Sequence, residues 1–237
     1  MTRVALLRYP GTWSERDFEH ALSTVPGVET EIVWHDDVDL RGFDAAIVPG
    51  GFSYGDYLRA GAIAKLSRAT KELRRFAAEG RPVLGSCNGF QILCEAGLLP
   101  GALLRNVGLE YRCDWTNVRV ESDRTPWTAG LARENLRMPI GHGEGCWVAD
   151  PDTLAQVEEN AQVVFRYCDA RGAATPESNP NGSLANIAGV CNEDGNVVGL
   201  MPHPERCSEA LLGGTDGYRL LEQLLRSPVG VSRAVYR

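Results

Sequence analysis

One short stretch of this chain, residues 85–89 with the sequence GSCNG, limits most strongly what the rest can fold into. A short apolar run precedes it, and residues 90–93, which suit a helix, follow it. The pattern G-x-C-x-G is the cysteine form of a strand–turn–helix elbow that presents a nucleophile at the tip of a sharp turn. The elbow predicts that Cys87 lies at a helix N-terminus, where the positive end of the dipole favours a thiolate. On the pentad alone, a buried cysteine in an ordinary turn stays open as the alternative.

Strands and helices alternate before this elbow. The expected elements are strands over residues 3–9, 29–35 and 45–48, and helices over residues 14–25 and 63–79. Ser14 begins a segment that matches a helix capping box. Alternation of this kind predicts a parallel sheet that is covered by helices on both faces.

Strands with short connections are expected after Gly97. They lie over residues 111–121, 136–140, 163–168, 184–191 and 197–201, and a last helix is expected over residues 216–225. We therefore predict a single α/β domain over residues 1–237, with a mostly parallel central sheet, helices on both faces and an added antiparallel portion. Residues 227–237 show little pattern and are expected to form a mobile tail.

Charge and cysteine content exclude several functional classes. The net charge is −7 and the pI is near 5.2, so neither a nucleic-acid nor a membrane partner is expected. No apolar run approaches the roughly 18 residues of a membrane-spanning helix, and residues 1–8 are expected to form a strand rather than a signal peptide. The seven cysteines form no C-x-x-C pair, which predicts free thiols, a cytoplasmic location and no metal site.

A cysteine nucleophile needs a base, and two of the four histidines have a glutamate two residues later: His142 with Glu144, and His203 with Glu205. The second pair follows the apolar run 197–201, at the carboxyl end of a predicted buried strand. The first pair lies among three glycines, which suits a loop that approaches a substrate or an anion. We favour His203 and Glu205 as the catalytic pair, while a structural role for both pairs stays open.

An oxyanion intermediate needs two backbone N–H donors near the sulfur. The elbow supplies the N–H of Asn88, and the glycine-rich segment 49–52 is the candidate for the second donor. A plain glycine turn is the alternative for that segment. The chain contains no G-x-x-x-x-G-K-[ST] motif, so any ATP chemistry linked to it is expected on another chain.

Together, residues 85–91 and 203–205 resemble class I glutamine amidotransferases. Five further segments resemble the glutaminase subunits of phosphoribosylformylglycinamidine (FGAM) synthases: residues 49–61, 142–145, 179–183, 202–206 and 213–217. The resemblance spans residues 4–225. The chain departs from it at Thr12-Trp13-Ser14, where Ser-Asn-Cys is usual, and at Ser86, where isoleucine is usual.

The resemblance implies a class I glutamine amidotransferase-like fold and a role for each candidate residue. Cys87 would attack the side-chain amide of glutamine, and His203, oriented by Glu205, would act as acid and base. The assigned oxyanion donors are the backbone N–H groups of Asn88 and of Gly51 or Phe52. The residues assigned to substrate binding are Gln91, Gly50, His142 and Glu144.

The resemblance also implies partners. Ammonia would pass to a large FGAM synthetase subunit, which uses ATP and magnesium, and a small subunit would bridge the two chains. No cofactor is expected in this chain. Two alternatives remain at this point: a cysteine hydrolase or peptidase of a related elbow fold, and a non-catalytic scaffold subunit.

Overall fold

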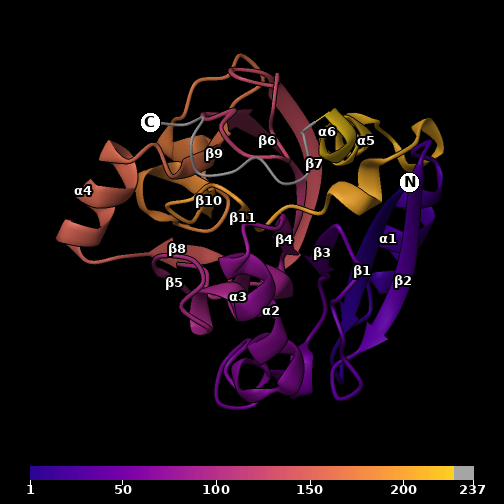
Figure 1. Cartoon of the computed structure of the whole chain (residues 1–237). Coiled ribbons are helices and arrows are strands. Elements are labelled where there is room, and N and C mark those ends of the chain that lie inside the picture. The colour runs from indigo at the N-terminus through magenta and orange to yellow at the C-terminus, as the bar shows by residue number, and fades with distance from the viewer. Residues whose placement is uncertain (227–237) are drawn as a thin grey trace.

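A nine-stranded sheet runs through the computed structural model, with helices on both of its faces (Figure 1). The structure describes the backbone of residues 1–226 and the side chains of residues 1–224. The tail expected over residues 227–237 lies outside this range. No helix in the described part of the chain is long and apolar enough to cross a membrane.

One half of the sheet is parallel. Its strands, in spatial order, are β2 (Val28–Trp34), β1 (Thr2–Arg8), β3 (Ala45–Val48), β4 (Val83–Ser86) and β11 (Val197–Leu200). Alternation along β1 shows why this half is buried on both faces, because Val4 and Leu6 enter one core and Ala5 and Leu7 enter the other. The apolar strands near the centre of the sheet hold the carboxyl ends from which the elbow and His203 project.

The other half of the sheet is antiparallel. It continues from β11 through β10 (Ile187–Cys191), β9 (Val163–Cys168), β6 (Arg112–Val120) and β7 (Asn135–His142). A separate two-stranded sheet pairs β5 (Ala102–Leu104) with β8 (Cys146–Val148). The predicted fold class, a parallel sheet with an antiparallel portion and helices on both faces, is confirmed.

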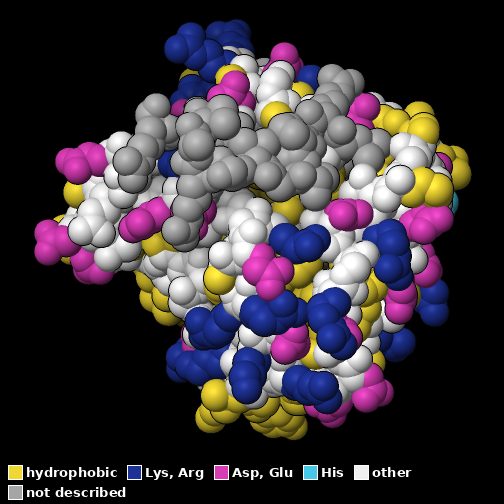
Figure 2. All heavy atoms as spheres, viewed as in Figure 1, with side chains coloured by type: hydrophobic (Ala, Val, Ile, Leu, Met, Phe, Trp, Pro, Cys, Tyr) yellow, Lys and Arg dark blue, Asp and Glu magenta, His cyan; other side chains and the backbone are white. Residues whose placement is uncertain are grey.

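Helices cover both faces of the sheet. The face with α2 (Arg68–Ala78), α3 (Asn88–Glu95) and α4 (Pro151–Glu159) buries Phe76, Phe90 and Val157. The face with α1 (Glu15–Ser23) and α5 (Asp216–Leu221) buries Phe18 and Leu220, and α6 (Gln223–Arg226) follows α5. Figure 2 shows basic side chains gathered over the region of α2, whose exposed residues include Arg68, Lys71 and Arg74.

Several element boundaries differ from the prediction. The helix expected over residues 63–79 is interrupted at Ser67, whose extended backbone and side chain cap the start of α2 by accepting a hydrogen bond from the Thr70 N–H. The strand expected from residue 184 begins at Ile187, after a 3₁₀ turn over Leu184–Asn186. Ser14 precedes α1 but makes no side-chain cap, so the predicted capping box is absent.

The prediction also missed α4 and the small sheet of β5 and β8. The start signal of α4 is present in the sequence, because Asp150 accepts hydrogen bonds from the N–H groups of Asp152 and Thr153, and Pro151 occupies the first helical turn. The helix buries only one residue, Val157, and therefore shows little of the apolar periodicity on which sequence-based assignment depends.

Candidate active site

The elbow forms as a strand, a strained residue and a helix. Cys87 joins β4 to α3 with φ 51° and ψ −109°, a conformation that side chains rarely adopt. Its N–H donates to the Leu200 carbonyl oxygen at 2.8 Å, which ties the turn to the neighbouring strand β11. A Cβ added at Gly89 would lie 1.8 Å from the Val48 carbonyl oxygen, so only glycine allows α3 to pack this closely on β3.

His203 follows β11, which lies next to β4 in parallel register with Leu200 opposite Ser86. Its imidazole Nδ1 lies 2.7 Å from Glu205 Oε1, and its backbone N–H donates to the Pro139 carbonyl oxygen at 2.9 Å. Both side chains are buried. The Nε2 atom of His203 is buried without a hydrogen-bond partner among the described residues, so this nitrogen remains available to a reacting group.

Gly50 lies close to the side chains of both Cys87 and His203. A Cβ added there would lie 2.9 Å from His203 Cε1 and 3.4 Å from Cys87 Cβ. The two side chains therefore converge on the same glycine, and any larger residue would separate them. The Cys87 thiol donates to the Gly141 carbonyl oxygen at 3.6 Å in this arrangement.

Electrostatics favour a protonated His203. Burial alone would lower the pKa of its imidazole, but the negative charges of Glu205 and of a Cys87 thiolate outweigh that effect and raise the pKa to about 10. A protonated His203 would in turn stabilise the thiolate form of Cys87. The arrangement can thus hold a thiolate and an imidazolium, the pair that nucleophilic catalysis by cysteine uses.

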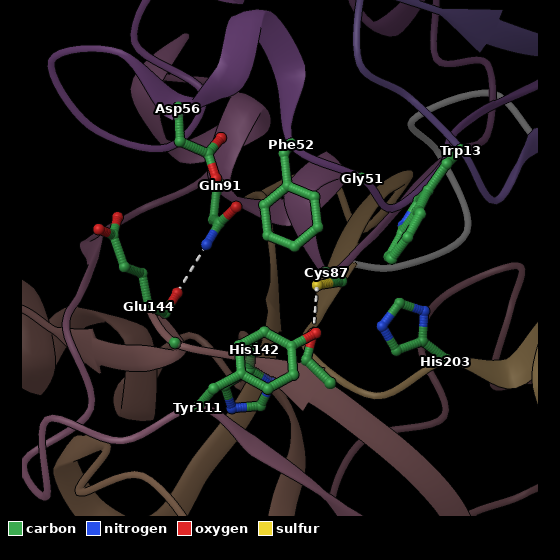
Figure 3. Close-up of a pocket in the computed structure, with 12 residues that line it drawn as sticks. Trp13, Gly51, Phe52, Asp56, Cys87, Gln91, Tyr111, His142, Glu144 and His203 are labelled. Carbon is green, nitrogen blue, oxygen red and sulfur yellow. Dashed lines mark hydrogen bonds between the residues drawn. The ribbon is translucent and has the colours of Figure 1, made fainter.

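These side chains open into a cavity of about 170 Å³ (Figure 3). Its lining includes the predicted residues Cys87, His203, Gly51, Phe52, Gln91, His142 and Glu144. The remaining predicted residues, Gly50, Asn88 and Glu205, lie behind this lining and contact it. The structure therefore brings all ten predicted site residues together around one pocket.

The candidate oxyanion donors are not equally available. The Phe52 N–H donates to the Gly11 carbonyl oxygen at 2.9 Å, and the Gly50 N–H donates to Ser14 Oγ at 2.7 Å. Phe52 therefore does not serve as a donor while this contact persists, which corrects its assignment for this conformation. The N–H groups of Gly51 and Asn88 are left as the candidate pair.

Residues of α3 form a fixed network beside the cavity. Asn88 Nδ2 donates to Gln91 Oε1 at 2.9 Å, and Gln91 Nε2 donates to the Glu144 carbonyl oxygen at 2.6 Å. Asn88 Oδ1 accepts from the Ser53 N–H at 3.1 Å. This network links the loop after β3, the helix of the elbow and the connection between β7 and β8, so the positions of Asn88 and Gln91 depend on three segments distant in sequence.

His142 and Glu144 do not form a second catalytic pair. His142 is the last residue of β7 and is buried, which corrects the expectation that it lies in a free glycine loop. Glu144 Oε2 accepts from the Ala60 N–H at 3.3 Å, and its Oε1 lies 3.8 Å from Arg105 Nε. The carboxylate is therefore engaged away from the imidazole, although both residues line the pocket.

Sequence reasoning missed Trp13, Asp56 and Tyr111, which also line the cavity. Asp56 belongs to the glycine-rich segment after β3, and its charged side chain in that segment was the available signal. The Trp13 ring meets the Phe52 ring edge-on at 5.3 Å, a contact that no local pattern predicts.

Ser86 and Ser14, where the chain departs from the related sequences, both have partners in the structure. Ser86 Oγ donates to the Pro202 carbonyl oxygen at 3.2 Å and lies 3.5 Å from Glu205 Oε2. Ser14 Oγ is the acceptor for the Gly50 N–H. Both hydroxyls therefore contact residues next to the candidate nucleophile or base.

Several known proteins resemble this chain in sequence or in fold. The family of CobB/CobQ-like glutamine amidotransferase domains matches residues 1–213. Two relatives are named phosphoribosylformylglycinamidine synthase subunit PurQ. The relative from Thermomicrobium roseum is 55% identical over 224 residues, covering 94% of this chain and 95% of its own. The relative from Methanosarcina barkeri is 54% identical over 224 residues, covering 94% and 97%. A solved structure of PurLQS from Thermotoga maritima matches with a TM-score of 0.84 and 42% identity, and covers 95% of this chain and 98% of that one.

Proposed function

This chain belongs to the CobB/CobQ-like glutamine amidotransferase family, within which it is a glutaminase subunit of FGAM synthase in purine biosynthesis, and we propose that it hydrolyses glutamine in the pocket around Cys87. One observation carries this assignment. A cysteine in a strained elbow shares a pocket with His203, whose Nδ1 lies 2.7 Å from the Glu205 carboxylate.

The first half of the reaction forms a thioester. The Cys87 thiolate attacks the side-chain amide carbon of glutamine, and the amide oxygen becomes an oxyanion held by the N–H groups of Asn88 and Gly51. His203 then gives its Nε2 proton to the departing nitrogen. The carbon–nitrogen bond breaks, ammonia leaves, and a glutamyl thioester on Cys87 remains.

The second half restores the enzyme. His203, now neutral, removes a proton from water, and the resulting hydroxide attacks the thioester carbonyl through a second oxyanion in the same site. Collapse of that intermediate releases glutamate and regenerates the thiolate beside a protonated His203. Glu205 stabilises the imidazolium in both halves and keeps the ring in one orientation.

We propose that the ammonia passes to a large synthetase subunit, with a small subunit bridging the two. The PurLQS relative supports this assembly. ATP and magnesium are assigned to the synthetase partner.

We also propose that the whole chain is one domain, because strands from residue 2 to residue 200 share one sheet. Seven free cysteines in the described residues support a cytoplasmic location.

The test replaces the nucleophile in the assembled complex. Cys87→Ala should abolish FGAM formation from glutamine but leave its formation from added ammonium salt unchanged, because only the supply of ammonia is lost. The matched control is Cys113→Ala, which removes an exposed cysteine and should leave both activities intact.

Loss of both activities in a correctly assembled Cys87→Ala complex would contradict the assignment, as would glutamine-dependent synthesis that survives the substitution. Family membership decides against the cysteine peptidase that the elbow alone left open. A scaffold role predicts that Cys87 does not react with an electrophilic glutamine analogue in the complex, whereas the proposed mechanism predicts a covalent adduct on this residue.

A further inference from the structure

Two carboxylates, those of Asp56 and Glu144, lie at one side of the cavity, and Cys87 and His203 lie at the other (Figure 3). Asp56 comes from the loop after β3, and Glu144 from the connection between β7 and β8. A substrate whose amide group reaches Cys87 therefore extends its opposite end toward these carboxylates.

The two carboxylates differ in how far the protein already satisfies them. Glu144 accepts from the Ala60 N–H and lies 3.8 Å from Arg105 Nε. Asp56 has only the amide of Asn88, whose Nδ2 lies 3.4 Å from Asp56 Oδ1, and no basic partner among the described residues. Asp56 is thus a pocket carboxylate for which the described side chains provide no counter-charge.

The surroundings of Asp56 disfavour its charged form in the empty pocket. Partial burial and the negative charge of Glu144 raise the pKa of Asp56 to about 6. A cation placed in the cavity would reverse both effects, since it would offset the desolvation and screen the repulsion between the carboxylates. The pocket is therefore electrostatically matched to a ligand that carries a positive charge at this end.

An independent observation on the same cavity concerns His142. Asn181 Oδ1 accepts from the Ser183 N–H at 3.1 Å and Nδ2 donates to the Gly145 carbonyl oxygen at 2.8 Å, which fixes the orientation of the amide and places its NH₂ group 3.0 Å from His142 Nε2. Burial, with the neighbouring His203, lowers the pKa of His142 to about 3, so the ring is neutral. A neutral ring that accepts at Nε2 carries its proton on Nδ1.

The Nδ1–H group of His142 has no acceptor in the part of the chain that the structure describes. Nδ1 is buried without a hydrogen-bond partner among the described residues, the residue is only 3% exposed, and His142 is one of the residues that line the cavity. A buried donor without an acceptor is costly, so a ligand oxygen in the cavity would stabilise it. The pocket thus offers a carboxylate for a cation and a neutral donor for an oxygen, a combination that matches a zwitterionic amino acid.

Resting on the proposed function, we propose that Asp56 determines substrate specificity by binding the α-ammonium group of glutamine, while His142 Nδ1–H donates to an oxygen of the same molecule. Glutamine is then distinguished from other primary amides by its charged end rather than by its amide. Glu144, which already has partners, adds negative potential but is not the main contact.

The test compares glutamine with glutaramate, which has the same amide and carboxylate but a hydrogen in place of the α-ammonium group. In the assembled complex, Asp56→Asn should raise the KM for glutamine by roughly 10- to 100-fold, the loss of one charge-assisted hydrogen bond, with little change in kcat. The KM for glutaramate, or its inhibition constant if turnover is slow, should stay unchanged. The substitution would thereby remove the preference for glutamine.

The matched control is Asp194→Asn, which removes the same charge from an exposed hairpin turn and should leave both KM values unchanged. Equal weakening of both ligands in Asp56→Asn would indicate a structural role and overturn the inference, as would an unchanged preference for glutamine. Either result leaves the proposed function standing, because that function is tested separately by the two activities of the Cys87→Ala complex.

Discussion

At the scale of single residues, the properties of the site depend on which atoms already have partners. His203 Nδ1 is bound to Glu205 while its Nε2 is buried and unpaired, so one nitrogen is oriented and the other is available. The same principle separates the oxyanion candidates, because the Phe52 N–H is engaged with Gly11. The motif around Cys87 predicted the reacting groups, but their hydrogen-bond partners come from segments that no local pattern connects.

Replacing Glu205 should reveal how strongly its charge acts. Glu205→Gln removes the negative charge that raises the pKa of His203, so the pKa should fall and the thiolate–imidazolium pair should be less populated at neutral pH. We expect kcat for glutamine hydrolysis to fall by roughly 10²- to 10⁴-fold. The rate of Cys87 alkylation by iodoacetamide, measured against pH, should fall at pH 7.

Glu209→Gln is the matched control, since Glu209 Oε1 lies 3.1 Å from His20 Nε2 and the residue does not line the pocket. An unchanged alkylation profile in Glu205→Gln would show that the carboxylate does not control the charge of His203.

At the scale of elements, the site is assembled where β3, β4 and β11 end side by side. The segment 10–14 lies against the loop after β3, with the Gly50 N–H bound to Ser14 and the Phe52 N–H bound to Gly11. The parallel strands and the elbow could be predicted because their apolar runs and glycines are local signals. The contact between segments 10–14 and 50–54 could not, because it pairs two irregular loops mostly through backbone groups, together with the Ser14 hydroxyl.

The close packing of α3 on β3 can be tested at Gly89. In Gly89→Ala the new methyl group would meet the Val48 carbonyl oxygen, so α3 must shift and carry Cys87 with it. We expect the free energy of unfolding in urea to fall by about 3 kcal/mol or more, the size of a severe overpacking effect, together with loss of glutaminase activity.

Gly108→Ala is the control, because a methyl group there meets only the flexible end of Arg112 at 3.4 Å. Equal stability of the two variants would mean that the helix can move away from the strand without cost.

At the scale of the whole molecule, the sheet separates two hydrophobic cores, and the active site lies at its edge among buried polar groups. Such groups couple the chemistry of the pocket to global stability, because ionising or neutralising them changes the free energy of unfolding. His142 is the clearest case, since burial keeps its ring neutral.

Stability should therefore fall in acid partly through His142. Its pKa is about 3 in the folded chain, below its ordinary value of 6.5, so between these values the unfolded chain binds a proton that the folded chain does not. The contribution is complete above pH 6.5 and is lost as the pH falls toward 3, at up to about 1.4 kcal/mol per pH unit. His142→Asn should make urea unfolding free energies less dependent on pH between 6 and 4.

His20→Asn replaces an exposed histidine and should leave that dependence unchanged. A slope in His142→Asn as steep as in the parent chain would contradict a neutral buried ring.

The register between β4 and β11 has a consequence for how damage to the enzyme would be detected. Ser86 lies opposite Leu200. Ser86 is one residue before Cys87, and Leu200 is three residues before His203. A slip of a single position between these strands would displace one group relative to the other by about 3.3 Å and would also turn the side chains of the slipped strand to the opposite face of the sheet. Such damage would therefore appear as lost turnover together with a fall in the free energy of unfolding.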